Sequence, residues 1–226
     1  MSASRKESME ARSIPHVLVA IATLALTVSV SIALGCTSER RSPDQMHAGA
    51  LKASEEASVA VFPEEVPLHT STVKVQGDEI AVITTKKGKI EIRFFPQDAP
   101  NHVASFIELA ESGFYDGTTF HRVEPGFVVQ GGDPYSKTGE GPVGTGGPGW
   151  RLKAEFNSRH HVEGTVAMAR AKDPDSAGSQ FYICLAPAPF LDGQYTVFGE
   201  VVEGMDVVKR LQPGDVMESV RIEHRP

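Results

Sequence analysis

The chain has 226 residues, with 22 lysines and arginines against 29 aspartates and glutamates, which gives a formal net charge of -7. This length suffices for one domain of ordinary size plus additional segments. The negative charge argues against a nucleic-acid partner, because no basic surface would gather phosphates. Cys36 and Cys184 stand far apart and outside any metal-ligand spacing, so the sequence predicts neither a disulfide framework nor a zinc site.

Residues 1–36 have the layout of a secretory signal. Basic residues precede an apolar run over 17–34, which ends in the letters ALGC at 33–36. This ending resembles a bacterial lipobox, and the resemblance implies that Cys36 is lipidated and becomes the mature N-terminus. An uncleaved membrane helix is the alternative, because about 18 apolar residues are just enough to span a bilayer. In either case we expect a membrane-anchored protein of the cell envelope, with its domain on the extracytoplasmic side.

Residues 37–78 form a segment rich in serine, glutamate, alanine and proline, with few aromatic residues and no sustained hydrophobic period. Such a composition buries too little apolar surface to offset the entropy lost when a chain becomes ordered. We therefore expect a flexible tether over 37–78 and a single ordered domain over 79–226.

The first elements expected in this domain are a hairpin and a helix. Strand-like segments over 79–85 and 89–95 flank a Lys-Gly turn, which is a hairpin pattern. The letters DAPNHVASFIELAESG at 98–113 then predict a helix. Pro100 suits its first turn, and apolar residues recur at helical spacing behind it.

The rest of the domain has the pattern of an all-β fold. Further strands are expected over 119–123, 127–131, 165–169, 180–185, 196–202 and 217–223, with a brief helix over 205–211. Short strands with turn-rich links and only two helices make the fold class mainly β. They predict a closed eight-stranded antiparallel barrel capped by two α-helices.

Three other patterns are weak indications of function. The letters GEGPVG at 139–144 satisfy the dinucleotide-binding spacing, but prolines in the same loop prevent the helix start that such a site needs. His160 and His161, near Glu155, could be drawn as metal ligands, but adjacent side chains diverge in strands and in most turns. Cys184 lies in an apolar strand-like segment. We therefore expect a surface loop, a turn and a small buried core residue, respectively.

The stretch FHRVEPGFVVQGGD at 120–133 sets Arg122 and Gln130 into an apolar run that has no serine or cysteine nucleophile. Taken alone, it fits an ordinary surface hairpin equally well. Together with GTVAMAR, SAGSQFYI and FLDGQYTVFGEVVEGMDVV further along, it resembles the signature segments of the cyclophilin family of peptidyl-prolyl cis-trans isomerases. The segments follow the family order, and the resemblance covers about Ile80 to Glu223.

The cyclophilin resemblance implies an active site on the outer face of the barrel. Arg122 would be the catalytic arginine, assisted by Gln130, and Gln130 and Gln180 would bind the peptide backbone and position the arginine. The backbone of Arg170 would bind the residue before the substrate proline. The proline pocket would comprise Phe127, Val128, Ala169, Tyr182 and Leu191, with Phe190 and Tyr195 closing its rim. The resemblance implies no cofactor and no metal.

The chain departs from the family pattern at several pocket positions. Phe190 stands where many eukaryotic members have the tryptophan that donates to cyclosporin, so reduced inhibitor sensitivity is expected. Tyr182 replaces a commoner phenylalanine and brings a hydroxyl that needs a hydrogen-bond partner. Val128 is smaller than the usual methionine. Because strict alternation cannot place Phe127, Val128 and Gln130 on one face, a bulge or strong twist is expected there.

The sequence therefore predicts a peptidyl-prolyl cis-trans isomerase that assists the folding of envelope or secreted proteins. Its partners would be proline-containing unfolded or extended polypeptides and, through the N-terminal anchor, a membrane. No nucleic-acid partner is expected, and the isomerase domain is expected to be monomeric. The alternative is a membrane-tethered chaperone that binds proline peptides without significant turnover, which the changes at Tyr182 and Val128 motivate.

Overall fold

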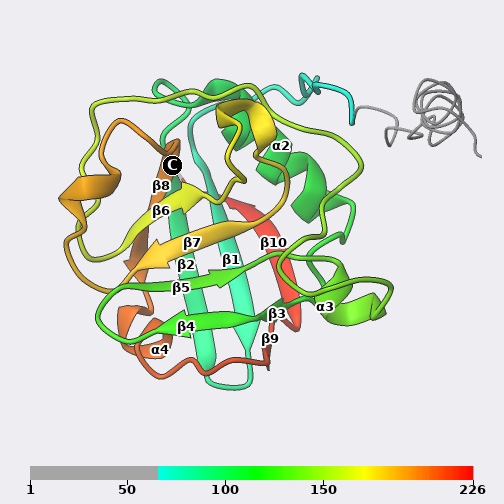
Figure 1. Ribbon diagram of the computed structural model, residues 1–226. Coiled ribbons are helices and arrows are strands. Elements are labelled where there is room, and N and C mark those ends of the chain that lie inside the picture. The colour runs from blue at the N-terminus through cyan, green and yellow to red at the C-terminus, as the bar shows by residue number, and fades with distance from the viewer. Residues whose placement is uncertain (1–65, 226) are drawn as a thin grey trace, which may run out of the picture. The chain divides into compact units, whose positions relative to one another are not determined.

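The computed structural model describes residues 66–225, whose arrangement is shown in Figure 1. The expectations for the signal at 1–36, including lipidation of Cys36, and for the tether as far as residue 65 lie outside the described residues. No helix within 66–225 combines the length and the apolar character that crossing a bilayer requires. The first strand begins at Glu79.

A curled eight-stranded antiparallel sheet forms most of the fold, with the strand order β10-β1-β2-β8-β6-β7-β5-β4 (Figure 1). Its strands are β1 (Glu79–Thr85), β2 (Gly88–Phe94), β4 (Arg122–Glu124), β5 (Val128–Gly131), β6 (Thr165–Met168), β7 (Phe181–Cys184), β8 (Val197–Glu203) and β10 (Ser219–His224). The predicted mainly β class is confirmed. The predicted hairpin is also confirmed, because β1 and β2 pair antiparallel with Ile83 opposite Ile90.

The two ends of this sheet, β10 and β4, do not pair with each other in the described part of the chain. A separate ladder joins the segments that lead into them. It consists of β3 (Thr119–Phe120) and β9 (Asp215–Val216), with Thr119 opposite Val216. The sheet is therefore a curled, open half-barrel, and the closed barrel expected from the sequence is not confirmed.

The predicted strand over 119–123 is divided in two. Its first part, β3, pairs with β9, whereas β4 pairs with β5, and His121 between them belongs to neither strand. A residue pattern predicts that a segment is extended, but it does not predict which strand the segment pairs with. The change of pairing partner at His121 could therefore not be predicted from the sequence. The short strand β9 was missed for the same reason.

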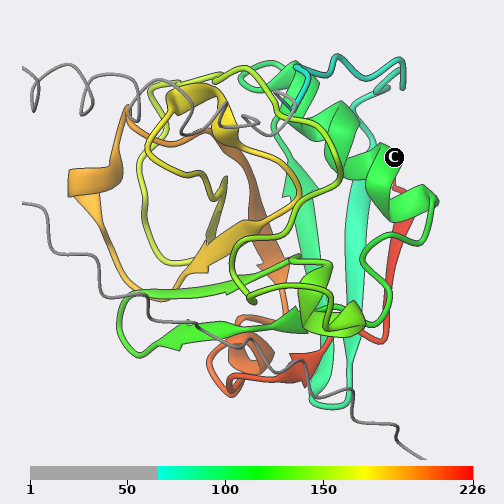
Figure 2. The same ribbon diagram turned by 45° about the vertical axis from the view of Figure 1, so that its right-hand side comes forward.

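Helical segments complete the described chain: α2 (Pro100–Glu111), α3 (Tyr135–Thr138), α4 (Met205–Val208) and the 3₁₀ turns η1 (Pro174–Ser176) and η2 (Pro189–Leu191). α2 and α4 lie at opposite ends of the curved sheet in both views (Figures 1 and 2). They are the two helices that the sequence predicts, although α4 ends at Val208 rather than Leu211. The single turn α3 has no counterpart in the prediction.

The start of α2 depends on a residue from a distant loop. Ala99 is the N-cap and Pro100 occupies the first turn, as predicted, but no side chain of the helix itself caps it. Instead, the carboxylate of Glu155 accepts the backbone N–H of Asn101 at 3.0 Å and that of His102 at 2.9 Å. A carboxylate at this position satisfies unpaired N–H groups and complements the helix dipole.

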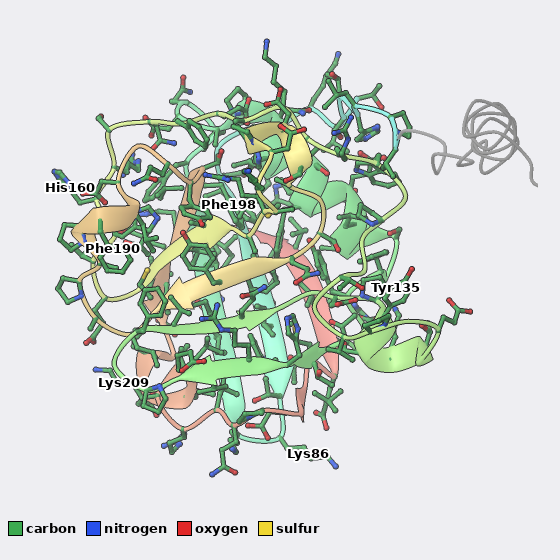
Figure 3. The ribbon with its side chains drawn as sticks, in the orientation of Figure 1. Lys86, Tyr135, His160, Phe190, Phe198 and Lys209 are labelled. Carbon is green, nitrogen blue, oxygen red and sulfur yellow. The ribbon has the colours of Figure 1, made fainter. Side chains whose placement is uncertain are left out.

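The core inside the curled sheet is built around packed aromatic rings. Between ring centroids, Phe106 of α2 lies 4.9 Å from Tyr115, and 5.5 Å from both Phe181 of β7 and Phe198 of β8. These rings are fully buried, and Figure 3 shows Phe198 within the fold while Phe190 projects from its surface. Each such pair adds about 0.5–1.5 kcal/mol beyond area burial, so the cluster fixes α2 against the sheet.

Residues 66–78, which the sequence assigns to the tether, contact the domain. Leu68 forms a parallel bridge with Arg151, and the N–H of His69 donates to the Arg151 carbonyl at 2.8 Å. The guanidinium of Arg151 in turn donates through Nε to the carbonyl of Val66 at 2.8 Å. The end of the predicted tether therefore lies against the loop that carries Arg151.

Candidate active site

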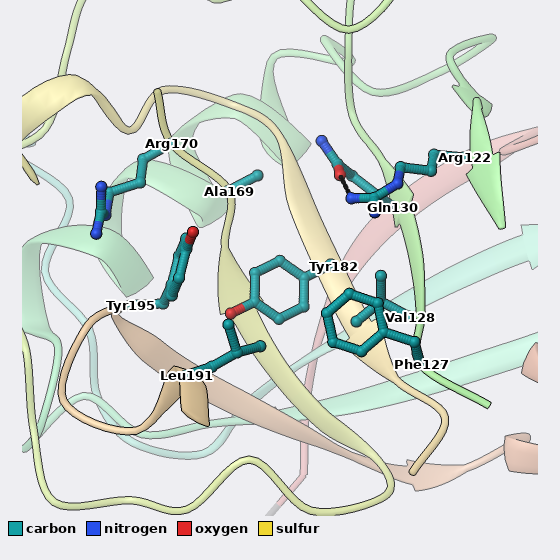
Figure 4. A pocket seen from close by; sticks show the side chains of 9 residues that line it. All are labelled: Arg122, Phe127, Val128, Gln130, Ala169, Arg170, Tyr182, Leu191 and Tyr195. Atoms are coloured by element: carbon teal, nitrogen blue, oxygen red, sulfur yellow. Dashed lines mark hydrogen bonds between the residues drawn. The ribbon is translucent and has the colours of Figure 1, made fainter. Parts of the chain in front are cut away.

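A pocket opens on the outer face of the sheet, beside β5 and β7 (Figure 4). Its volume is about 130 Å³. It is lined by Arg122, Phe127, Val128, Gln130, Ala169, Arg170, Tyr182, Leu191 and Tyr195. Nearly all of the predicted site residues are thus brought together. Two are not in the lining: Gln180 is buried and lines a second hollow that shares Gln130 with the pocket, and Phe190 stacks on Phe127 at the rim.

Strand register explains why these residues meet. In the antiparallel pair β5–β7, Gln130 lies opposite Tyr182, and in β6–β7 Ala167 lies opposite Tyr182 as well. Residues opposite one another share a face of the sheet. The alternate residues, such as Val129 and Ile183, therefore face the main core, whereas Val128 and Tyr182 belong to a second cluster under the pocket.

Phe127 reaches the pocket without the bulge that was expected. The register of β5 with both of its neighbours is continuous, so no extra residue interrupts the strand. Phe127 instead precedes β5, next to Gly126, whose φ of 71° ends the preceding turn. Val128 and Gln130 are two residues apart and share a face by ordinary alternation. Of the bulge or strong twist that the sequence predicts here, the bulge is absent from β5, because Phe127 is not part of the strand.

Arg122 is held at the edge of the pocket by a chain of amides. It lies opposite Gln130 in the β4–β5 pair, and its Nη1 donates to Oε1 of Gln130 at 3.4 Å, the dashed line in Figure 4. Nε2 of Gln130 donates to Oε1 of Gln180 at 3.0 Å, and Nε2 of Gln180 donates to the Gly146 carbonyl at 2.9 Å. Gln180 is buried, so the chain has a fixed end.

The hydroxyl of Tyr182 has the partner that burial demands. It lies 3.0 Å from Nε2 of His161, whose Nδ1 lies 2.9 Å from a carboxylate oxygen of Asp192. Asp192 only accepts, so Nδ1 of His161 carries a proton; in the neutral ring Nε2 then accepts, and the tyrosine hydroxyl donates. Burial raises the pKa of Tyr182 well above its ordinary value. Hydrogen bonds from His160 and His161 lower the pKa of Asp192.

Sequence reasoning missed His161 and Asp192. His160 and His161 do lie in the loop before β6, as expected, but His161 is buried while His160 is exposed. The signal that could have found this contact was the tyrosine itself, since a buried phenolic hydroxyl requires a partner. Which residue supplies it is a tertiary matter.

Arg170 and Tyr195 form the wall opposite Arg122 (Figure 4). The guanidinium carbon of Arg170 lies 4.6 Å from the ring centroid of Tyr195. On the rim, Phe190 stacks on Phe127 with 5.7 Å between ring centroids and remains 64% exposed. The pocket is therefore apolar at its base and carries one arginine on either side.

The other sequence patterns have structural explanations. The glycine-rich stretch over 139–144 is a loop, as expected, and the buried carboxylate of Asp133 accepts the N–H of Gly146 at 3.2 Å behind it. Cys184 is buried as predicted, and burial raises the pKa of its thiol to about 12. These residues organise the pocket's surroundings rather than offering a second chemistry.

Residues 80–225 match the family described as "Cyclophilin type peptidyl-prolyl cis-trans isomerase/CLD". The chain belongs to the cyclophilin family. This cyclophilin is 48% identical over 144 residues to a peptidyl-prolyl cis-trans isomerase of Synechococcus elongatus, a match that covers 63% of the chain and 94% of the relative. It is 49% identical over 137 residues to peptidyl-prolyl cis-trans isomerase B of Bacillus subtilis, with 60% and 91% covered.

Solved cyclophilins have the same fold. A cyclophilin from Hirschia baltica superposes with a TM-score of 0.57 at 28% identity, covering 65% of this chain and 74% of the other. A cyclophilin type peptidyl-prolyl cis-trans isomerase from Cryptosporidium parvum superposes with a TM-score of 0.59 at 27% identity, covering 66% and 99%. This cyclophilin is accordingly an enzyme of the peptidyl-prolyl cis-trans isomerase class.

Proposed function

We propose that this enzyme accelerates rotation about X-Pro peptide bonds by stabilising the twisted bond with Arg122. The observation that carries the proposal is a guanidinium fixed at the edge of an apolar pocket by Gln130 and, behind it, by the buried Gln180. The pocket offers a hydrogen-bond donor and an apolar surface. No nucleophile is needed for the reaction, because no covalent bond is broken.

The physical basis is the electronic change that accompanies rotation. The barrier of about 18–20 kcal/mol arises because twisting destroys amide resonance. At the twisted geometry the proline nitrogen regains its lone pair and becomes a hydrogen-bond acceptor. A guanidinium donates to that nitrogen more strongly than to the planar ground state, and such differential binding is what lowers a barrier. Arginine suits this task because it stays protonated and its donors are rigidly arranged.

The apolar base of the pocket fits the substrate's proline ring. We assign this contact to the side chains of Phe127, Val128, Tyr182 and Leu191. Holding the ring means that rotation moves the residue before the proline, and a bound substrate that excludes water from Arg122 would strengthen the field of its guanidinium. A solved relative gives support: the Cryptosporidium parvum enzyme was also determined in the presence of the dipeptide Ala-Pro, and it superposes with a TM-score of 0.55 at 26% identity.

We assign to the enzyme a place in the cell envelope, with extended or unfolded proline-containing segments of envelope or secreted proteins as its substrates. The support is the signal-like sequence of residues 1–36, which ends in Cys36, and the segment rich in serine, glutamate, alanine and proline that follows it. Mass spectrometry of the membrane-bound protein tests the anchor. A mature N-terminus at Cys36 that carries acyl chains would support lipidation, whereas a full-length chain with an unmodified Cys36 would indicate an uncleaved helix.

The test of the catalytic proposal is an isomerisation assay on a proline peptide with the wild-type protein and with Arg122→Ala and Arg122→Lys. We expect Arg122→Ala to reduce kcat/KM by about 100-fold or more, because it removes a transition-state donor. Arg122→Lys keeps the charge but loses the rigid donor geometry, so it should recover only part of the rate. Equal rates for wild type and a folded Arg122→Ala would reject the proposal.

The alternative of a chaperone without turnover loses one of its two motivations, while the smaller Val128 remains in the pocket lining. The other motivation was a tyrosine hydroxyl that would have made the pocket polar. That hydroxyl donates to His161 instead, so the ring of Tyr182 presents an apolar face to the pocket. Binding of a proline peptide with no rate enhancement would restore this alternative.

A further inference from the structure

Arg170 differs from the other arginines of the described chain in its ion pairing. Every other arginine in residues 66–225 has a carboxylate oxygen within 4.0 Å; these are Arg93, Arg122, Arg151, Arg159, Arg210, Arg221 and Arg225. Arg170 makes no such ion pair within the described part of the chain. Its charge therefore remains available to a ligand.

The guanidinium of Arg170 is nevertheless held in place. Nε and Nη2 donate to the carbonyl of Gln194 at 3.1 and 3.0 Å, and Nη1 donates to the carbonyls of Ala171 at 2.9 Å and Lys172 at 3.2 Å. The guanidinium carbon also lies 5.8 Å from the ring centroid of Phe156, in addition to its contact with Tyr195. Carbonyl groups fix the side chain but contribute only partial charges, so a full positive charge is held with little entropy left to lose on binding.

The fixed charge of Arg170 lies in the wall of the proposed substrate site. Arg170 lines the proline pocket and also an adjoining hollow, and the two share Gln130 and Ala169 as common walls. None of the residues that line either hollow is an aspartate or a glutamate. Arg122, the other cation of the pocket, has Glu124 at 3.5 Å, so the uncompensated charge lies on the Arg170 side. A peptide whose proline occupies the pocket brings its neighbouring side chains to this wall.

We propose that Arg170 makes the enzyme prefer substrates with an acidic side chain directly beside the proline. The inference rests on the proposed function of the pocket and specifies its substrate class. The expected size is that of a largely exposed ion pair, a gain of about two- to fivefold in kcat/KM for glutamate over glutamine. Because the site is open to solvent, added salt should reduce the gain.

The test uses matched peptide pairs and the full-length protein. One pair carries Glu or Gln immediately before the proline, and the other carries Glu or Gln immediately after it. At one of the two positions, we expect a Glu/Gln ratio of kcat/KM of about two to five at low salt. The ratio should decrease in 0.5 M salt, because screening then limits the interaction between exposed charges to a few ångströms. The position that shows the gain identifies the side chain that Arg170 meets.

Variants separate this local effect from other causes. Arg170→Gln should bring the ratio to about one, Arg170→Lys should keep part of it, and Arg170→Glu should invert it. Lys86→Gln removes the same charge from the exposed β1–β2 turn and should leave the ratio unchanged. A structural loss would slow both peptides alike and would not move the ratio. If the wild type isomerises all of the peptides and the Glu/Gln ratio of kcat/KM is one at both positions, the inference is overturned. If no peptide is isomerised, the result counts against the proposed function instead.

Discussion

The hydroxyl of Tyr182 lies 3.0 Å from Nε2 of His161, and both side chains are buried. The ring of Tyr182 is part of the proline pocket, while its hydroxyl belongs to a hydrogen-bonded chain that ends at Asp192. A departure from the commoner phenylalanine is thereby accommodated without a polar group in the pocket. The same contact fixes the plane of the ring against which a substrate would pack.

We predict that Tyr182→Phe lowers the free energy of unfolding by about 1–2 kcal/mol, because it leaves Nε2 of His161 buried without a partner. Tyr182→Phe combined with His161→Leu should cost less than the sum of the two single changes, with a coupling of at least about 0.5 kcal/mol. Urea unfolding of the four proteins measures this coupling. Additive single changes would contradict a working hydrogen bond between the two residues.

We predict that Gln180→Leu reduces kcat/KM by about tenfold, because the loss of its amide frees Gln130 and with it Arg122. Gln180 is a positioning residue here, so the effect should depend on the arginine. In an Arg122→Ala background, Gln180→Leu should have little further effect. Gln212→Leu, an exposed glutamine outside the pocket lining, is the matched control. If Gln180→Leu and this control have the same activity, the amide chain does not position the arginine.

We predict a pH-dependent contribution of Glu155 to stability. Burial alone raises the pKa of this carboxyl, but hydrogen bonds from His102 and from the first turn of α2 outweigh burial and hold the pKa below its ordinary value of 4.5. A lowered pKa stabilises the folded state above the ordinary value, and this stabilisation is lost as the pH falls through the folded value. Glu155→Gln should therefore cost about 1–3 kcal/mol at pH 7.

The stability difference between wild type and Glu155→Gln should depend on pH in a defined direction. Below a pH of about 4.5 the difference between wild type and Glu155→Gln should shrink, because the wild-type carboxyl becomes protonated too. Urea unfolding at several pH values measures the difference. Glu140→Gln, which changes an exposed glutamate in a loop, should give no comparable difference at any pH. A Glu155→Gln difference that stays constant down to pH 3 would disprove the assigned role of ionisation.

We predict that Phe190→Trp increases sensitivity to cyclosporin. Phe190 is exposed at the rim and stacks on Phe127, so a larger ring fits there without repacking the core. The indole adds one N–H donor, and one additional hydrogen bond corresponds to about a two- to tenfold lower inhibition constant. The measurement is cyclosporin inhibition of isomerase activity. Phe114→Trp alters a partly buried phenylalanine outside the pocket lining and should leave the inhibition constant unchanged. An unchanged inhibition constant for Phe190→Trp as well would refute the prediction.

The sequence by itself determined most of the strands, the two main helices and, through the family resemblance, most of the pocket residues. Alternation and turn chemistry are local properties, so β1, β2 and α2 were predictable from residues that are neighbours in the chain. The family resemblance supplied Arg122, Gln130 and the apolar side chains around them. It did so because those residues lie in segments whose spacing the chain retains.

Only the tertiary structure decided that the β3–β9 ladder joins the segments leading into the two edge strands β4 and β10. It further decided that β5 has no bulge beside Phe127 and that the hydroxyl of Tyr182 is hydrogen-bonded to His161. It also decided that Glu155 caps α2 and that Arg170 has no acidic partner within residues 66–225. Each of these facts concerns a pair of groups that are distant in sequence and adjacent in space. Local pattern fixes which way a side chain points along its own strand or helix, whereas its partner is set by packing of the whole domain, where burial makes every unpaired polar group costly.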